Sequence, residues 1–255
     1  MIEALLLAAL GGALVGFLLA TFGGGGSVLA MPWLVYVVGV GDTHIAIGTS
    51  AAAVALSAAA ALAAQARAGT VKWPCASVFA AAGIAGALAG AHIAKQVDGT
   101  ALLGFFALAM AAVAIGMALP RKNEGDPDVR IDGRLVAKLA PTGLVTGFAA
   151  GFFGIGGGFL IAPGLMAATG MTLANAAASS LLSVTIFGAS TSASYAWSGL
   201  VDWPLFGALV AGGVAGTWPG VVAARYLTDR APLARRLFAL MILAVAASIL
   251  VSVLW

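Results

Sequence analysis

The chain has 255 residues, of which 62% are hydrophobic and 8% charged, with a formal net charge of +3 and a mean hydropathy of +1.08. An average soluble domain carries roughly 25% charged residues, so the composition predicts a polytopic membrane protein and excludes a water-soluble fold. The single cysteine, Cys75, excludes an internal disulfide. The start, Met1-Ile2-Glu3, lacks the positive region of a secretory signal, so the first apolar segment is expected to be a retained helix.

Apolar runs follow one another along the chain, separated by polar or glycine-rich breaks. In the first half they cover residues 3–21, 27–40, 43–66, 74–94 and 101–119. In the second half, after a charged segment, they cover residues 139–153, 158–170, 173–198, 204–224 and 237–254. This pattern predicts an all-α membrane helical bundle. We expect a first transmembrane repeat at 1–119, a charged linker at 120–138 and a second transmembrane repeat at 139–255.

The two sets of runs form an internal repeat. With a shift of 131 positions, Gly16, Phe22, Gly23, Gly25, Gly26 and Pro32 match Gly147, Phe153, Gly154, Gly156, Gly157 and Pro163. With a shift of 130, Thr49-Ser50 matches Ser179-Ser180, and GTVKWP at 69–74 matches GLVDWP at 199–204. A register kept over so many glycine, proline and tryptophan residues indicates a duplicated unit.

Each half contains a glycine run inside an otherwise apolar stretch, FGGGGSVLAMP at 22–32 and FGIGGGFLIAP at 153–163. The apolar segments that follow, 27–40 and 158–170, have 14 and 13 residues. A helix needs about 20 residues to cross the hydrocarbon. We therefore expect broken or re-entrant helices at the glycine motifs, with half-helices that begin near Ser27 and Gly158.

Basic residues predict the orientation, because cytoplasmic loops retain lysine and arginine. They concentrate in three loops, at Arg67, Lys72, Arg121, Lys122, Arg130, Arg134, Lys138, Arg225, Arg230, Arg235 and Arg236. To place all three loops in the cytoplasm, each half needs an odd number of crossings, either three spans plus a hairpin or five crossings of which one is short. The prediction is an inverted repeat with a cytoplasmic linker and both termini outside.

Glycine turns at matching positions of two inverted halves would approach the membrane midplane from opposite sides. The first-turn N–H groups of a helix lack internal partners and attract anions. Two hydroxyl pairs follow the half-helices and could complete the ligand shell. The predicted substrate-binding residues are Gly23, Gly24, Gly25, Gly26, Ser27, Thr49, Ser50, Gly154, Gly156, Gly157, Gly158, Ser179 and Ser180.

Structural roles compete with this interpretation. Glycines in membrane helices often allow close packing of helices, and hydroxyl groups there often donate to backbone carbonyls of their own helix.

Other polar residues also have two possible roles. His44 is either a proton-sensitive gate or a loop-end cap. Gln65 and Tyr195, which align at a shift of 130, either line a pore or form ordinary interhelical hydrogen bonds. Lys95 and Arg225 stand at predicted helix ends, where their side chains can reach the interface.

The segments GFLLATFGGGGSVLAMP and GFAAGFFGIGGGFLIAP, followed by the hydroxyl pairs in AIGTS and AAASS, resemble the sulfite exporter family TauE/SafE. The resemblance covers the chain apart from the linker. It implies export of small sulfur-containing anions, such as sulfite, sulfoacetate or related organosulfonates, across the cytoplasmic membrane. The family's glycine motifs fall here on Gly23–Gly26 and Gly154–Gly158. Ser27 stands where the second motif has Gly158, so the two halves of the site can differ.

We therefore expect a secondary transporter whose anion binds between the two glycine turns. The alternatives are uptake or exchange of another small anion, and an anion-binding membrane component that does not transport. The sequence contains no catalytic constellation, so we expect no enzyme, no catalytic residue, no cofactor and no metal site. The expected partners are a small inorganic or organosulfur anion and the lipid bilayer, with no nucleic acid, and the oligomeric state stays open.

Overall fold

The computed structural model describes residues 2–118, 125–154, 158–228 and 230–254. The first half contains α1 (Ile2–Phe22), η1 (Gly23–Leu29), α2 (Ala30–Pro32), η2 (Trp33–Val38), α3 (Thr43–Arg67), α4 (Trp73–Ala94) and α5 (Gly99–Ala118). The second half contains α6 (Gly133–Phe153), α7 (Gly158–Thr169), α8 (Leu173–Trp197), α9 (Trp203–Thr228) and α10 (Ala231–Leu254). Among the described residues, seven helical stretches are long and apolar enough to cross a membrane. The predicted all-α, polytopic membrane bundle is confirmed.

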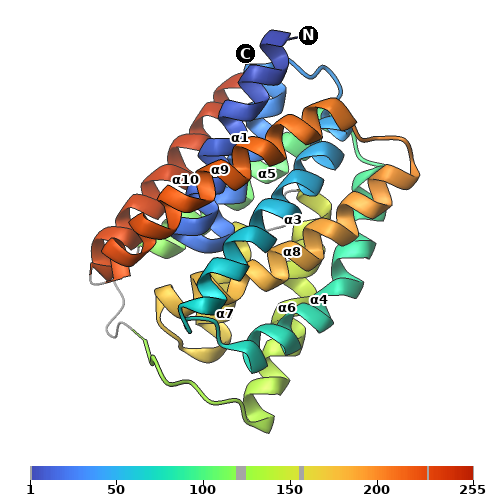
Figure 1. Cartoon of the computed structure of the whole chain (residues 1–255). Coiled ribbons are helices and arrows are strands. Elements are labelled where there is room, and N and C mark those ends of the chain that lie inside the picture. Colours follow the sequence, from blue (N-terminus) through green and yellow to red (C-terminus); the bar gives the residue numbers. More distant parts are fainter. Residues whose placement is uncertain (1, 119–124, 155–157, 229, 255) are drawn as a thin grey trace.

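The helices pack in pairs that combine one element from each half. α3 packs against α8 at the centre, the α1–α9 pair lies on one side and the α4–α6 pair on the other (Figure 1). α5 packs against α10. The start of α1 and the end of α10 lie at one end of the bundle, and the described linker residues 125–132 lie at the other (Figure 1). We call these the terminal end and the linker end.

Side-chain caps set where several helices begin. The Asp42 carboxylate accepts the His44 N–H over 2.7 Å and starts α3, and the Asp132 carboxylate accepts the Leu135 N–H over 2.7 Å and starts α6. Such caps satisfy N–H groups that lack a partner within the helix. Because of the Asp132 cap, α6 begins at Gly133, so part of the expected 120–138 linker is helical.

Each half opens with a helical hairpin that turns at a glycine. Gly23 and Gly154 hold φ angles of 67° and 66°, a left-handed conformation that glycine adopts without steric cost. After Gly23 the chain returns along α1, and the Trp33 indole N–H donates to the Leu7 carbonyl over 2.9 Å. α7 returns along α6 in the same way, since Gly164 lies against Thr146. Each half thus consists of a long first helix, a shorter returning segment and three further helices.

The returning segment of the first half differs from the expected half-helix. It begins at Gly23, not near Ser27, as the 3₁₀ helix η1, and continues through α2 into the π-helix η2. Four consecutive glycines favour α-helix weakly, and Pro32 lacks the N–H that an α-helical turn requires. In the second half, α7 is an α-helix that begins at Gly158, as expected.

A contact between the two halves can occur twice, with the repeat partners of the two residues making the second contact. Gly16 packs against the Gly213 backbone, and its repeat partner Gly147 packs against Gly83. α3 and α8 run antiparallel, because Gly48 near the start of α3 lies against Leu200, which follows α8, while Gly188 faces Ala51 and Ala55. An inverted repeat would produce this arrangement, and the inverted relation remains our interpretation.

Candidate functional site

The two glycine motifs meet inside the bundle. Gly23–Ser27 and Gly158 are buried, and a Cβ atom added at either Gly24 or Gly158 would overlap the backbone of the other glycine. This contact joins the two repeats backbone to backbone, as the expectation of adjacent turns requires. Gly154 is also buried and lies against Ile47. Gly156 and Gly157 lie outside the described residues.

The first glycine turn is tied to α8 by hydrogen bonds. The Gly24 N–H donates to the Ser180 hydroxyl oxygen over 3.0 Å, and the Ser180 hydroxyl donates to the Ala177 carbonyl over 2.7 Å. The Ser27 hydroxyl donates to the Gly24 carbonyl over 2.7 Å. The Gly24 N–H thus has its acceptor outside its own helix. A hydroxyl from the other half supplies the acceptor, because the packing of α8 against η1 brings Ser180 beside the turn.

The first hydroxyl of each pair binds a loop of the opposite half. Ser179 Oγ accepts the Lys72 N–H over 2.9 Å, and Thr49 Oγ1 accepts the Asp202 N–H over 2.9 Å. Lys72 and Asp202 are repeat partners at a shift of 130, as are Thr49 and Ser179. The two bonds are therefore the same interaction made twice, once at each end of the bundle.

The structure does not gather the four predicted hydroxyls at one point. Ser179 and Ser180 bond near the linker end, whereas Thr49 bonds to the loop before α9 near the terminal end. The Ser50 hydroxyl donates to the Ile47 carbonyl over 3.1 Å, and Ile47 packs against Gly154. Ser180 thus bonds the glycine turn of the other half directly, whereas Ser50 bonds within α3 to the residue that packs against Gly154.

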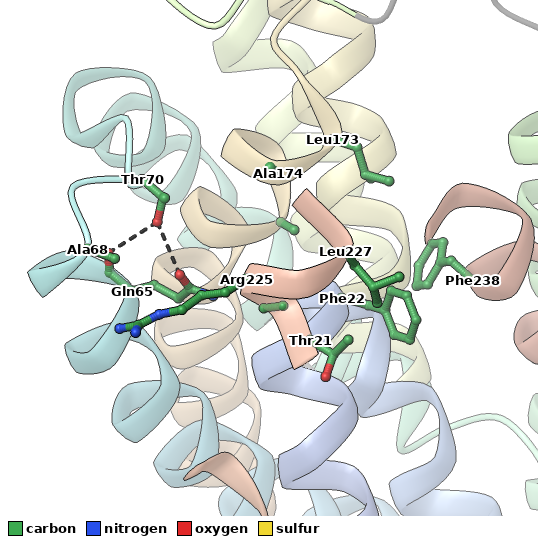
Figure 2. A pocket seen from close by; sticks show the side chains of 12 residues that line it. Thr21, Phe22, Gln65, Ala68, Thr70, Leu173, Ala174, Arg225, Leu227 and Phe238 are labelled. Carbon is green, nitrogen blue, oxygen red and sulfur yellow. Dashed lines mark hydrogen bonds between the residues drawn. The ribbon is translucent and has the colours of Figure 1, made fainter. Parts of the chain in front are cut away.

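A cavity of about 90 Å³ opens beside the first glycine turn, at the linker end. Figure 2 shows Gln65, Thr70 and Arg225 on one side of it and Phe22, Leu227 and Phe238 on the other. The lining is Thr21, Phe22, Gln65, Ala68, Thr70, Leu173, Ala174, Ala177, Ala224, Arg225, Leu227 and Phe238.

The floor of this cavity consists of the residues that enclose the glycine turn. Phe22 directly precedes Gly23, Gly23 packs against the Ala177 backbone, and Gly25 packs against the Phe238 ring. The Phe22 and Phe238 rings contact each other with centroids 5.7 Å apart. A solute in the cavity is therefore separated from the turn by two aromatic rings and by the Ala177 segment.

The mouth of the cavity carries its one cationic side chain, Arg225. Arg225 is exposed, and no described carboxylate forms an ion pair with it. Gln65 donates its amide to the Ala20 carbonyl over 3.2 Å, and Thr70 donates to Gln65. Gln65 thus combines both of the roles considered for it, interhelical bonding and lining a cavity. The arginine and the polar groups can bind the charged part of an anion, and the apolar floor can contact a small apolar part of the same solute.

Sequence reasoning assigned no binding role to Arg225, because an arginine at a helix end is common. It also missed two buried hydroxyls on α8, Ser183 and Thr191. Their side-chain oxygens, like that of Tyr195, find no hydrogen-bond partner among the described residues. Ser183 lies one helical turn beyond Ser180. Buried polar groups without partners cost free energy, so such oxygens are candidate contacts for water or a polar solute.

Taken together, apolar helices long enough to span a membrane, hairpins broken at glycine and a cavity with one cationic side chain near a glycine turn define a multi-pass membrane protein of the transporter class. The family model "Sulfite exporter TauE/SafE" matches residues 8–249, and the chain belongs to that family. Two relatives in Xylella fastidiosa, strains Temecula1 and 9a5c, are each named "Probable membrane transporter protein". Each is 43% identical over 100% of this chain and 96% of its own length. No solved structure matches the chain.

These findings make the chain a membrane transporter and not an enzyme. The family description also names a small anion as the kind of solute that its members export. The resemblance stated from the glycine motifs is confirmed.

Proposed function

We propose that this transporter exports small sulfur-containing anions, such as sulfite, sulfoacetate or related organosulfonates, across the cytoplasmic membrane. The anion enters the cavity past Arg225 and binds at the first glycine turn after the Phe22 and Phe238 rings separate. The observation that carries the proposal is that the exposed Arg225 lines a cavity whose lining also includes residues next to the Gly23–Gly25 turn, namely Phe22, Ala177 and Phe238. The family description supports the choice of anion.

Arg225 attracts the anion without holding it deep in the membrane. Its side chain is exposed at the cavity mouth, where water weakens a single ion pair. Deeper in the path, the described groups that can bind an anion are neutral, namely the Gly24 N–H and the Ser180 hydroxyl. The anion would take the place of Ser180 as the acceptor of the Gly24 N–H. Neutral donors release an anion more readily than a buried cation does, which suits turnover.

The linker end is proposed to face the cytoplasm. The loops and helix ends there carry Arg67, Lys72, Arg130, Arg134 and Arg225. Cytoplasmic loops are enriched in such residues. The cavity then opens to the cytoplasm, from which an exporter must take its substrate, and both chain termini lie outside.

The membrane potential can drive this export. With the cytoplasm negative, moving one negative charge outward is favoured by about 2.3 kcal/mol per 100 mV. The described acidic residues stand at helix starts and in loops, as Asp42, Asp98 and Asp202 do, and not in the middle of a span. We therefore propose a uniport without a coupling ion.

Sulfite efflux from proteoliposomes tests this function. Arg225→Gln should lower the efflux rate at subsaturating sulfite by about tenfold, the loss of a charge-assisted contact. Arg67→Gln, which removes an exposed charge at the same end but outside the cavity, should leave the rate unchanged. A panel of oxyanions and sulfonates separates export of sulfur anions from transport of another anion. Saturable binding with no flux of any anion would overturn the transport proposal.

A further inference from the structure

The two repeats are packed alike in the interior but differ at the two ends of the bundle. Gln65 and Tyr195 are repeat partners at a shift of 130, as are Arg225 and Lys95. At the linker end, Gln65 and Arg225 line the cavity. At the terminal end, Tyr195 is 0% exposed, and His44 and Lys95 lie against its ring.

A compact cluster fills the position that corresponds to the cavity. The Tyr195 ring stacks on His44 with centroids 6.3 Å apart, and Lys95 Nζ lies 5.8 Å from the centre of the same ring. Lys95 Nζ also donates to the Ser194 carbonyl over 3.2 Å, to the Ser194 hydroxyl over 3.1 Å and to the Ser198 hydroxyl over 3.1 Å. The ammonium group thus donates to Ser194 on α8 and to Ser198 directly after it. Arg225, in contrast, forms no ion pair with a described carboxylate.

The Tyr195 hydroxyl and His44 Nδ1 are buried without a hydrogen-bond partner among the described residues. A closed cluster that buries two polar atoms without hydrogen-bond partners is less stable than an arrangement in which both atoms have partners. Both atoms would gain partners if the cluster separated and admitted water or an anion. Phe153, the repeat partner of Phe22, also contacts a second ring, since the Phe106 and Phe153 centroids are 5.6 Å apart and those of Phe22 and Phe238 are 5.7 Å apart.

We propose that Lys95, Tyr195 and His44 form a second anion-docking site, closed in this conformation, at the opposite end of the substrate path. Tyr195 closes the mouth, and Lys95 is the cation that docks the anion once it leaves Ser194 and Ser198. The class of ligand is the small oxyanion or sulfonate of the proposed function, on which this inference rests. The entrance at the linker end is then in its open form, and the equivalent entrance at the terminal end is in its closed form.

Cysteine labelling tests this site without a transport assay. The only cysteine of the chain, Cys75, is replaced by Ala, and a reporter is placed one residue before each cation as Ala224→Cys or Ala94→Cys. Ala224 lines the cavity, whereas Ala94 is 0% exposed. A membrane-impermeant maleimide should label Ala224→Cys from the linker side and leave Ala94→Cys nearly unlabelled. Adding Lys95→Gln or Tyr195→Ala should raise the labelling of Ala94→Cys from the terminal side by more than about tenfold.

His92→Gln serves as the matched control, because His92 is exposed on the last turn of α4 outside the cluster. It should leave labelling unchanged. In the Tyr195→Ala background, sulfoacetate should protect Ala94→Cys while Lys95 is present and lose this effect in Tyr195→Ala/Lys95→Gln. Sulfoacetate is the probe because sulfite itself reacts with maleimides.

Equal labelling of the two reporters, or no response to either cluster variant, would overturn the proposal. Protection that does not depend on Lys95 would overturn the docking role. If labelling and protection behave as expected but no sulfur anion crosses the membrane, the second site is supported and the proposed transport function fails.

Discussion

Gly24 donates its backbone N–H to the hydroxyl of Ser180 over 3.0 Å, so a glycine turn of one repeat is held by a helix of the other. Both residues are buried, and Ser180 in turn donates to the Ala177 carbonyl. The hydrogen bond lies next to the floor of the cavity, to which Ala177 also contributes. Any solute that reaches the turn must compete with Ser180 for this donor.

The first prediction concerns this hydrogen bond. Ser180→Ala removes the acceptor and leaves the buried Gly24 N–H unpaired, which costs about 1 to 3 kcal/mol. The thermal unfolding temperature in detergent should fall. Ser190→Ala is the control, since the Ser190 hydroxyl bonds only within its own helix, to the Ile186 carbonyl. An equal effect of the two variants would show that the Gly24 bond contributes nothing specific.

The second prediction concerns the backbone contact between the repeats. Gly158→Ala places a methyl group against the Gly24 carbonyl, where neither backbone can move without separating the turns. Transport should be lost, and the amount of folded protein should decrease. Gly207→Ala on α9 meets open space, so it should be neutral or stabilise the helix by up to about 1 kcal/mol. Normal efflux by Gly158→Ala would contradict the packing described for the two turns.

The third prediction pairs a loss with its rescue. Gly25→Ala directs a methyl group into the ring of Phe238, a side chain that can be shortened. Efflux should fall in Gly25→Ala and return in large part in Gly25→Ala/Phe238→Leu. This coupling would be measured as a double-mutant cycle on the efflux rate. If the two substitutions act independently, the Phe238 ring does not limit the space around the turn.

The fourth prediction compares two equivalent hydrogen bonds, one accepted by each repeat. Thr49→Val and Ser179→Ala each remove the acceptor of a loop N–H, from Asp202 and Lys72 respectively, over the same distance of 2.9 Å. Each should lower the free energy of unfolding by about 0.5 to 1.5 kcal/mol. Thr49→Ser keeps the oxygen and should retain most of the stability. Thermal unfolding of the purified variants measures all three, and a large difference between the first two would argue against equivalent roles.

Much of the fold could be predicted because its signals are local. Apolar runs and glycine or proline breaks placed the helices, and the positive φ that a tight turn needs selects glycine at Gly23 and Gly154. The 3₁₀ and π character of residues 23–38 was not predictable, since it depends on how four glycines and Pro32 pack against α1.

The candidate site was predictable only in part. The glycine turns do meet, but the Gly24–Ser180 bond depends on α8 packing against the other repeat, which no local pattern reveals. Arg225 resembled an ordinary helix-end residue, since its place in the cavity arises from the meeting of α1, α3, α8, α9 and α10. The repeat alignment of Arg225 with Lys95 was the signal that could have drawn attention to both.

The central claim is that the anion that enters this cavity binds at the first glycine turn. An experimental structure determined with bound selenite, a heavier analogue of sulfite, tests this most directly. The account predicts density for the anion beside the Gly24 N–H and the Ser180 hydroxyl, with the 3.0 Å bond between them lengthened or broken. Density confined to the lipid-facing surface, or an intact Gly24–Ser180 bond with the anion bound elsewhere in the bundle, would contradict it.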